Sequence, residues 1–148
     1  MDLTRRQLHA LWPLLIAECA ASTAADGAGA ALPSRCYSFE NLPVRVDHTN
    51  HAEYRQVFTG VTNDGCPIDL HITTMPPGQR PHPPHHHVHE EMMLVQKGQL
   101  EATIAGKSST VGPGSVIYIA SNEEHGLRNP GNEPAQYFVL AIGQQTKA

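Results

Sequence analysis

The stretch GQRPHPPHHHVHEEMMLVQKG, residues 78–98, joins a histidine-rich loop to an apolar segment. Side chains of an extended segment alternate between its two faces, so His85 and His87 present their imidazoles on the same face. Glu91 follows four residues later and opens an apolar run that reaches Val95. Imidazoles and carboxylates are common ligands of divalent metal ions. The stretch therefore predicts a metal-binding loop that leads into a buried strand.

The sequence on both sides of this stretch predicts short strands separated by turns. Residues 67–74 alternate apolar and polar side chains, which is the period-2 pattern of a half-buried strand. Further strands are expected at 35–39, 56–61, 91–97, 99–105, 108–111, 115–120, 126–128 and 135–142. Many short strands at even spacing, with no helical pattern after residue 31, favour an all-β sandwich or closed barrel.

A fourth candidate ligand, His125, lies just beyond the predicted strand 115–120 and 38 residues after His87. Together with His85 and Glu91 these residues supply three imidazoles and one carboxylate. Such a donor set suits a borderline divalent ion, and four protein ligands leave a six-coordinate ion two open positions. Open positions allow a substrate or dioxygen to reach the metal directly.

Two spaced motifs in this region resemble those of the cupin superfamily. The first, G-x6-H-x-H-x3-E-x6-G, is one residue longer between its glycine and first histidine than the cupin pattern, and is formed by Gly78, His85, His87, Glu91 and Gly98. The second cupin pattern, G-x5-P-x-G-x2-H-x3-N, is matched in spacing by Gly114, Ala120, Asn122, His125 and Asn129. Ala120 and Asn122 stand where the pattern has proline and glycine.

The resemblance implies an all-β fold, a single cupin jelly-roll β-barrel over residues 31–148. It also implies that the metal is held by His85, His87, Glu91 and His125. Asn129 is expected to shape a turn rather than to coordinate. Small cupins commonly dimerise, and the segment 35–61 could supply strands to a partner. We therefore expect a homodimer whose contacts hide exposed strand edges.

Alternative roles for the histidines stay open. Residues 81–89 could form a surface run that scavenges metal, although this would leave Glu91 and His125 unexplained. His89 has the same strand parity as the two motif histidines and could replace Glu91 as a ligand.

Other side chains near the motif have expected orientations. His82 and His86 are expected in the loop or facing outward. His71 is either the polar wall of a pocket or solvated. If Glu91 points inward, Met93 and Val95 do too, and they would form an apolar wall beside the metal.

Composition excludes some classes of function. The 148 residues carry 10 Lys and Arg against 14 Asp and Glu, a net charge of −4, and no basic cluster large enough to bind nucleic acid. A hydrophobic content of 40% is too high for a disordered chain. The chain has room for one domain and none for an added helix-turn-helix.

Residues 1–30 have the order of a signal peptide. Thr4-Arg5-Arg6-Gln7-Leu8 resembles a twin-arginine export signal, and 28–30 (Ala-Gly-Ala) offers a cleavage site. The apolar run between them is too short and polar for a permanent membrane span. We therefore expect export to a bacterial periplasm, where Cys36 and Cys66 could form a disulfide or remain free thiols.

The expected function is that of a metal-dependent oxidoreductase of the dioxygenase type, acting on a small organic molecule. Glu91 or a pocket residue would move a proton. A hard carboxylate and cytoplasmic metal loading favour Mn(II) or Fe(II), while zinc, nickel and copper also bind such donors. The alternative is a periplasmic module that binds metal and a small-molecule ligand without turnover. A lyase or isomerase would have the same sequence features.

Overall fold

The computed structural model describes residues 31–144, and nine strands form its framework. The strands are β1 (Val44–Val46), β2 (Glu53–Val61), β3 (Pro67–Met75), β4 (Glu90–Lys97), β5 (Leu100–Ile104), β6 (Lys107–Val111), β7 (Val116–Ile119), β8 (His125–Arg128) and β9 (Ala135–Ile142). A short 3-10 turn, η2 (Phe39–Asn41), precedes them. Within these residues no helix is long and apolar enough to cross a membrane. The predicted signal peptide lies outside the described residues.

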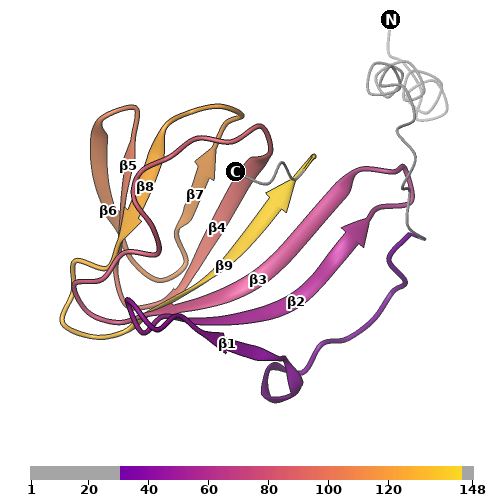
Figure 1. Ribbon diagram of the computed structural model, residues 1–148, viewed down its shortest axis with the longest axis horizontal. Coiled ribbons are helices and arrows are strands. Elements are labelled where there is room, and N and C mark those ends of the chain that lie inside the picture. Colours follow the sequence, from indigo (N-terminus) through magenta and orange to yellow (C-terminus); the bar gives the residue numbers. More distant parts are fainter. Residues whose placement is uncertain (1–30, 145–148) are drawn as a thin grey trace, which may run out of the picture.

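The strands form two antiparallel sheets that curl toward each other (Figure 1). The larger sheet has the order β1-β2-β3-β9-β4-β7 and the smaller one the order β6-β5-β8. Backbone pairing between His85 and His125 adds an isolated bridge beside the smaller sheet. The expected all-β jelly roll is thus confirmed, with its barrel built from two facing sheets rather than one continuous ladder.

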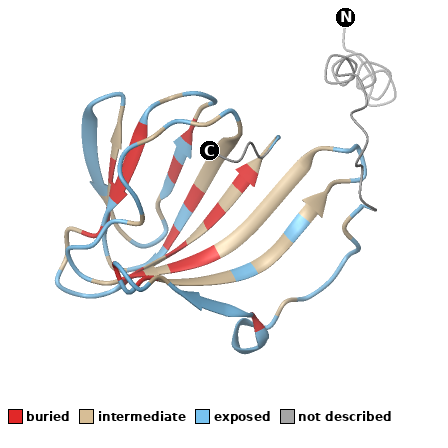
Figure 2. Cartoon of the chain, viewed as in Figure 1, coloured by how far each residue is buried: buried red, intermediate tan, exposed pale blue. Residues whose placement is uncertain are grey.

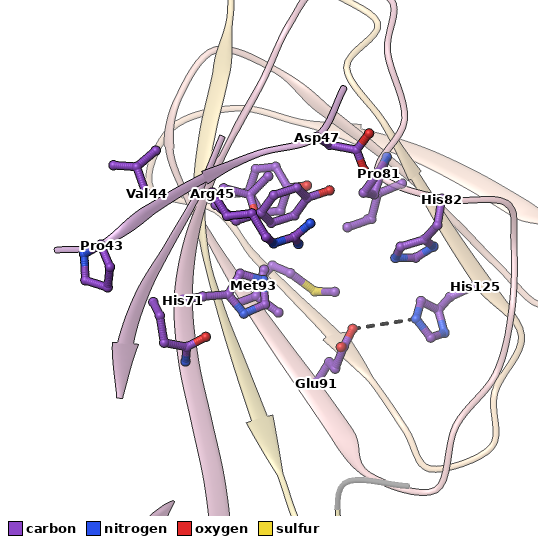
Figure 3. Close-up of a pocket in the computed structure, with 16 residues that line it drawn as sticks. Pro43, Val44, Arg45, Asp47, His71, Pro81, His82, Glu91, Met93 and His125 are labelled. Atoms are coloured by element: carbon purple, nitrogen blue, oxygen red, sulfur yellow. Dashed lines mark ion pairs between the residues drawn. The ribbon is translucent and has the colours of Figure 1, made fainter. Parts of the chain in front are cut away.

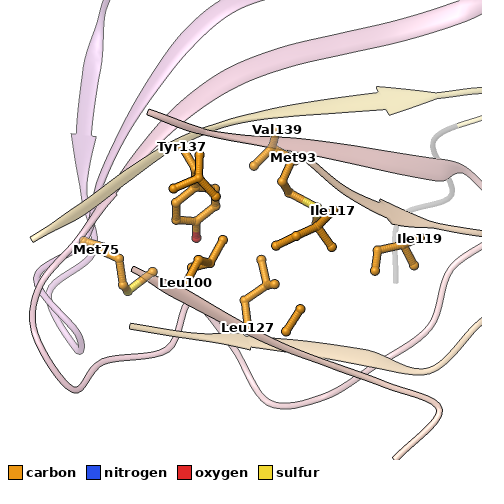
Figure 4. Close-up of a cluster of buried hydrophobic side chains, with 11 residues drawn as sticks. Met75, Met93, Leu100, Ile117, Ile119, Leu127, Tyr137 and Val139 are labelled. Atoms are coloured by element: carbon orange, nitrogen blue, oxygen red, sulfur yellow. The ribbon is translucent and has the colours of Figure 1, made fainter. Parts of the chain in front are cut away.

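The hydrophobic core fills the space between the sheets, and buried residues lie on the facing sides of both (Figures 2 and 4). Side chains from β3, β4, β5, β7, β8 and β9 meet there. The buried cluster comprises Ala52, Met75, Met93, Val95, Leu100, Ala102, Ile117, Ile119, Leu127, Tyr137 and Val139. Four of these core residues, Met93, Leu127, Tyr137 and Val139, also line a cavity.

The polar face of β3 points into the barrel. His71 is the register partner of Val139 on β9, and Val139 is in turn the register partner of Met93 on β4. Val139 and Met93 both belong to the core, so His71 faces the same side of the sheet as the core. The opposite, apolar face of β3 carries Ile72 on the outside of the sheet. There the segment 37–42 covers part of it and leaves a cavity of about 330 Å³.

This covering segment differs from the prediction. Residues 35–39 form no strand; they cross the outer face of the sheet, where the Tyr37 ring lies 5.8 Å from that of Phe58. The strand β1 was missed because it has only three residues. Cys36 and Cys66 are both free thiols.

Candidate metal centre

The backbone brings His85 and His125 together. The His85 N–H donates to the His125 carbonyl at 3.0 Å, and the His125 N–H donates back at 2.9 Å. Their imidazole centroids lie 4.6 Å apart. Gly126 permits this approach, because a Cβ there would stand 3.2 Å from Pro84. The proline-rich loop and β8 therefore pack side by side, which places ligands 40 residues apart in sequence at one point.

Asn122 supports the same arrangement at a position where the second motif has glycine. It adopts a left-handed backbone with φ of 60°, which asparagine tolerates better than most residues. Its N–H donates to the His87 carbonyl at 2.8 Å. The substitution therefore keeps the turn that presents His125.

Two further carbonyls orient the imidazoles. The Nδ1 of His87 lies 2.8 Å from the carbonyl of His89, and the Nδ1 of His125 lies 2.9 Å from that of Glu123. In a neutral ring, a proton on Nδ1 leaves a lone pair on Nε2. The Nε2 atoms of His87 and His125 are both buried without a hydrogen-bond partner. Both rings thus direct an acceptor nitrogen at the same interior point.

Glu91 spans the two nitrogens. Its Oε1 lies 3.4 Å from His87 Nε2. Its Oε2 lies 3.6 Å from His125 Nε2, the pair joined by the dashed line in Figure 3. Neighbouring ligands of an ion with bonds near 2.1 Å are about 3 Å apart, so these separations fit a shared metal after a small contraction.

The electrostatics favour a charged Glu91 carboxylate and a neutral His85. Burial acts to raise the pKa of Glu91, but the interactions with His125, His87 and His89 outweigh it and lower this pKa to about 2. Burial, aided by the neighbouring histidines, lowers the pKa of His85 to about 4. For His125, burial opposes protonation, yet the Glu91 carboxylate raises its pKa above the ordinary value. An anion and imidazole lone pairs are the donors that a divalent ion requires.

The four predicted ligands are brought together, and His89 joins them. One ring nitrogen from each of His85, His87 and His125 lies within 4.8 Å of the others, and His87, His89 and Glu91 form a second such group. His89 stacks on His87 with centroids 3.6 Å apart, and its Nε2 lies 3.4 Å from Glu91 Oε1. The alternative role for His89 therefore remains open.

The other loop histidines stand outside both groups. His86 is exposed, as expected. His82 is exposed but is not directed away from the site, because its ring meets that of His85 edge-on at 4.1 Å. Asn129, fully buried, donates to the carbonyls of Met75 and Glu133. The prediction that it shapes a turn is confirmed.

A cavity of about 650 Å³ opens beside Glu91 and His125 (Figure 3). Met93 lines it, as expected, whereas Val95 faces inward but is buried in the core and does not line the cavity. His71 lines it as well, so this histidine is a pocket wall rather than a solvated surface residue. A ligand in this cavity would contact both the metal ligands and a mixed polar and apolar surface.

Sequence reasoning missed the network behind His71. Its Nδ1 lies 3.3 Å from Asp69 Oδ1, while Thr59 and Gln56 donate to the other oxygen of Asp69. The sequence did contain one signal for this network, because Asp69 and His71 lie two residues apart in an alternating strand and so share a face. It also missed Asn50, which ties the β1–β2 turn to the proline-rich loop through the Arg80 carbonyl at 2.9 Å. No local pattern could have indicated that contact.

The comparisons with known proteins agree with this architecture. The family model of the cupin domain matches residues 71–142. No curated protein matches the chain. Among solved structures, a cupin-2 domain from Rhodospirillum rubrum is similar, with a TM-score of 0.64 and 17% identity over 80% of each chain.

Two other solved structures show the same likeness. An RmlC-like cupin from Shewanella frigidimarina has a TM-score of 0.62 and 14% identity over 76% of this chain and 94% of its own. A sugar phosphate isomerase of the cupin superfamily from Silicibacter pomeroyi has a TM-score of 0.62 and 12% identity over 75% and 76% of the two chains. At such identities the likeness concerns the fold.

Proposed function

Because the family model of the cupin domain matches residues 71–142 and the fold is that of cupins, we propose that this chain is a metal-dependent oxidoreductase of the dioxygenase type that acts on a small organic molecule. One divalent ion would be held by His85, His87, Glu91 and His125. The observation that supports this most is the pair of buried, unpartnered Nε2 atoms of His87 and His125 facing an ionised Glu91. Buried polar atoms are almost always paired. A metal ion is a partner that the two nitrogens and the Glu91 carboxylate could share.

The metal would supply a Lewis-acid and redox centre with positions open to substrate and dioxygen. Mn(II) or Fe(II) is the proposed ion, because a hard carboxylate and an incomplete protein ligand set suit octahedral coordination. Zinc, nickel and copper also bind such donors, so the native ion depends on where loading occurs.

Proton movement falls to two of the chain's own side chains. Glu91 is ionised and reaches the cavity, but with a pKa of about 2 it is a weak base, so it can accept a proton only from a strongly acidic group of a bound substrate. His71 faces the same cavity, and Asp69 holds its Nδ1 so that Nε2 is directed toward a ligand. The ionised form of Asp69 suits this orienting role, since its hydrogen bonds more than offset burial and lower its pKa.

Oxygen uptake tests the proposed activity. Metal-loaded protein is supplied with phenolic, dicarboxylate and keto-acid substrates, and dissolved oxygen is recorded. A substrate that consumes oxygen should do so with the wild type and His86→Ala but not with His87→Ala. If no substrate is consumed while ligands still raise the melting temperature, the protein is a metal- and ligand-binding module, and the oxidoreductase proposal fails.

We also propose export to the periplasm by the twin-arginine route, which carries folded proteins and would therefore place metal loading in the cytoplasm. The support is Arg5-Arg6 and the small residues at 28–30. Changing both arginines to lysine should leave the protein in the cytoplasm. Periplasmic protein after this change would contradict the route.

A homodimer is proposed as the assembly. Support comes from the outer face of the larger sheet, where Leu94, Val116 and Tyr118 on β4 and β7 expose 44%, 55% and 49% of their surface. β7 is also an edge strand of that sheet. A second copy would cover the apolar surface and the unpaired edge together.

A further inference from the structure

Arg45 stands on the rim of the cavity. It lies on β1 directly opposite Tyr54 of β2, and its guanidinium carbon is 4.4 Å from the centroid of the Tyr54 ring. Figure 3 shows its side chain lying across the cavity rather than directed away from it. Stacking on an aromatic face holds the guanidinium plane and leaves its N–H edges free to donate.

This guanidinium has no carboxylate partner among the described residues. Arg55 and Arg128 pair with Glu53 and Glu101 at 3.4 and 3.0 Å, but Arg45 makes no ion pair within 4.0 Å there. The acid on the same rim, Asp47, accepts from the backbone N–H and hydroxyl of Thr49 through Oδ1, and its charge interacts with Arg45 without forming an ion pair within 4.0 Å. A cation on the cavity wall is thus left with its hydrogen-bonding edge toward the space that a ligand would fill.

One part of the cavity wall is apolar, while Gln56, His71 and Thr73 line another part. Met93, Leu127, Val139 and Tyr137 contribute the apolar part, and each of these side chains is buried in the core. A ligand with an apolar body would pack against this apolar part of the wall. Its polar groups belong at the two ends, one beside Glu91 and His125 and the other beside Arg45.

We propose that Arg45 anchors the carboxylate of the ligand, and that the protein takes small monocarboxylates with an apolar or aromatic body and a second oxygen at the far end. Arginine presents two parallel N–H groups that match the two oxygens of a carboxylate, which makes it selective for this group over an amide. This proposal depends on the proposed function only for the end of the ligand away from Arg45, where the second oxygen would lie beside the metal. The contact between Arg45 and the carboxylate is inferred from the cavity alone and does not require a metal.

Calorimetric titration with 4-hydroxybenzoate and its uncharged isostere 4-hydroxybenzamide tests the anchor. Wild-type protein should bind the carboxylate about tenfold more tightly than the amide. Arg45→Gln should lose this preference and leave amide affinity unchanged. Arg128→Gln, which removes an arginine paired with Glu101 outside this cavity, is the matched control and should behave as the wild type. Equal melting temperatures of the two exposed-arginine variants would show that both are folded.

The same titrations on protein stripped of metal separate this proposal from the metal site. The tenfold preference and its loss in Arg45→Gln should persist there, even if the protein binds no metal or consumes no oxygen. Wild-type protein that binds neither probe, that binds both equally, or whose preference survives Arg45→Gln would overturn the anchor. Loss of the preference only on metal removal would also overturn it, because the carboxylate would then be a metal ligand.

Discussion

Backbone carbonyls decide which nitrogen of each imidazole faces the interior. The carbonyls of His89 and Glu123 accept from the Nδ1 atoms of His87 and His125, so the Nε2 atoms of both rings face the interior. Fixing the tautomer in this way orients a ligand and raises its basicity. Glu91 then supplies the negative charge between the two rings.

The fourth ligand can be decided at the residue level. Glu91→Gln should lower metal affinity by more than about 100-fold, because it removes the only carboxylate of the donor set. His89→Ala should lower it by less than about tenfold, since His89 would then act only by packing on His87. Competition with a chromogenic chelator measures both values, and His86→Ala is the control. The reverse order of effects would make His89 the ligand in place of Glu91.

Metal binding should release a proton at mildly acidic pH. The Glu91 carboxylate raises the pKa of His125, so the metal-free site holds a protonated His125 below that pKa, and an incoming ion must displace this proton. Metal affinity should therefore fall about tenfold per pH unit below the raised pKa and level off above it. His85 adds no competing proton until pH approaches 4. Calorimetry in buffers of different ionisation enthalpy counts the protons, and constant affinity between pH 5 and 7 would contradict the effect.

Among the connections between elements, the β4–β5 turn depends on glycine. Gly98 has φ of 75°, and a Cβ there would stand 2.6 Å from the Pro134 carbonyl oxygen and 2.8 Å from Ala135 Cα. Gly98→Ala should cost about 2–4 kcal/mol of unfolding free energy, from the left-handed backbone and the clash together. Gly114→Ala is matched in φ, at 82°, with nothing within 4 Å, and should cost about 1 kcal/mol. Urea denaturation compares them, and equal costs would rule out the clash.

The elements that the sequence predicts well are those with a local signal. Residues 135–142 form a strand with the predicted bounds, and residues 67–75 extend the predicted one by a single residue. Residues 35–39 have the composition of a strand, yet they pack across the sheet because Tyr37 and Phe39 cover apolar side chains on its outer face. That competition is tertiary and has no trace in the local pattern.

The residues of the candidate site also fall into those that the sequence predicts and those that it does not. The spacing of His85, His87 and Glu91 reflects one extended segment and its strand, so it can be read from sequence. The position of His125 follows from the second motif. Arg45 could not be found, because it lines the cavity through the pairing of β1 with β2. Asn50 could not be found either, because it contacts a loop 30 residues away. Alternation in β3 likewise did not tell which face is inside.

For the whole molecule, the proposed dimer predicts a measurable mass. Val116→Asp places a charge on the outer face of the larger sheet, where the wild-type side chain is 55% exposed and should be buried between two copies. Light scattering at micromolar concentration should give twice the chain mass for the wild type and a lower mass for this variant. Ser109→Asp, on an exposed strand of the smaller sheet, should stay dimeric. A monomer mass for the wild type would contradict the proposal.

The fold brings a loop histidine pair, a strand carboxylate and a distant histidine together beside the core. An anomalous-difference map from crystals of protein loaded with Mn(II) measures this directly. We predict a single peak at full occupancy, within roughly 2.0–2.3 Å of donor atoms from His85, His87, Glu91 and His125. A peak elsewhere on the chain, or a structure in which His125 points away from His85 and His87, would contradict it.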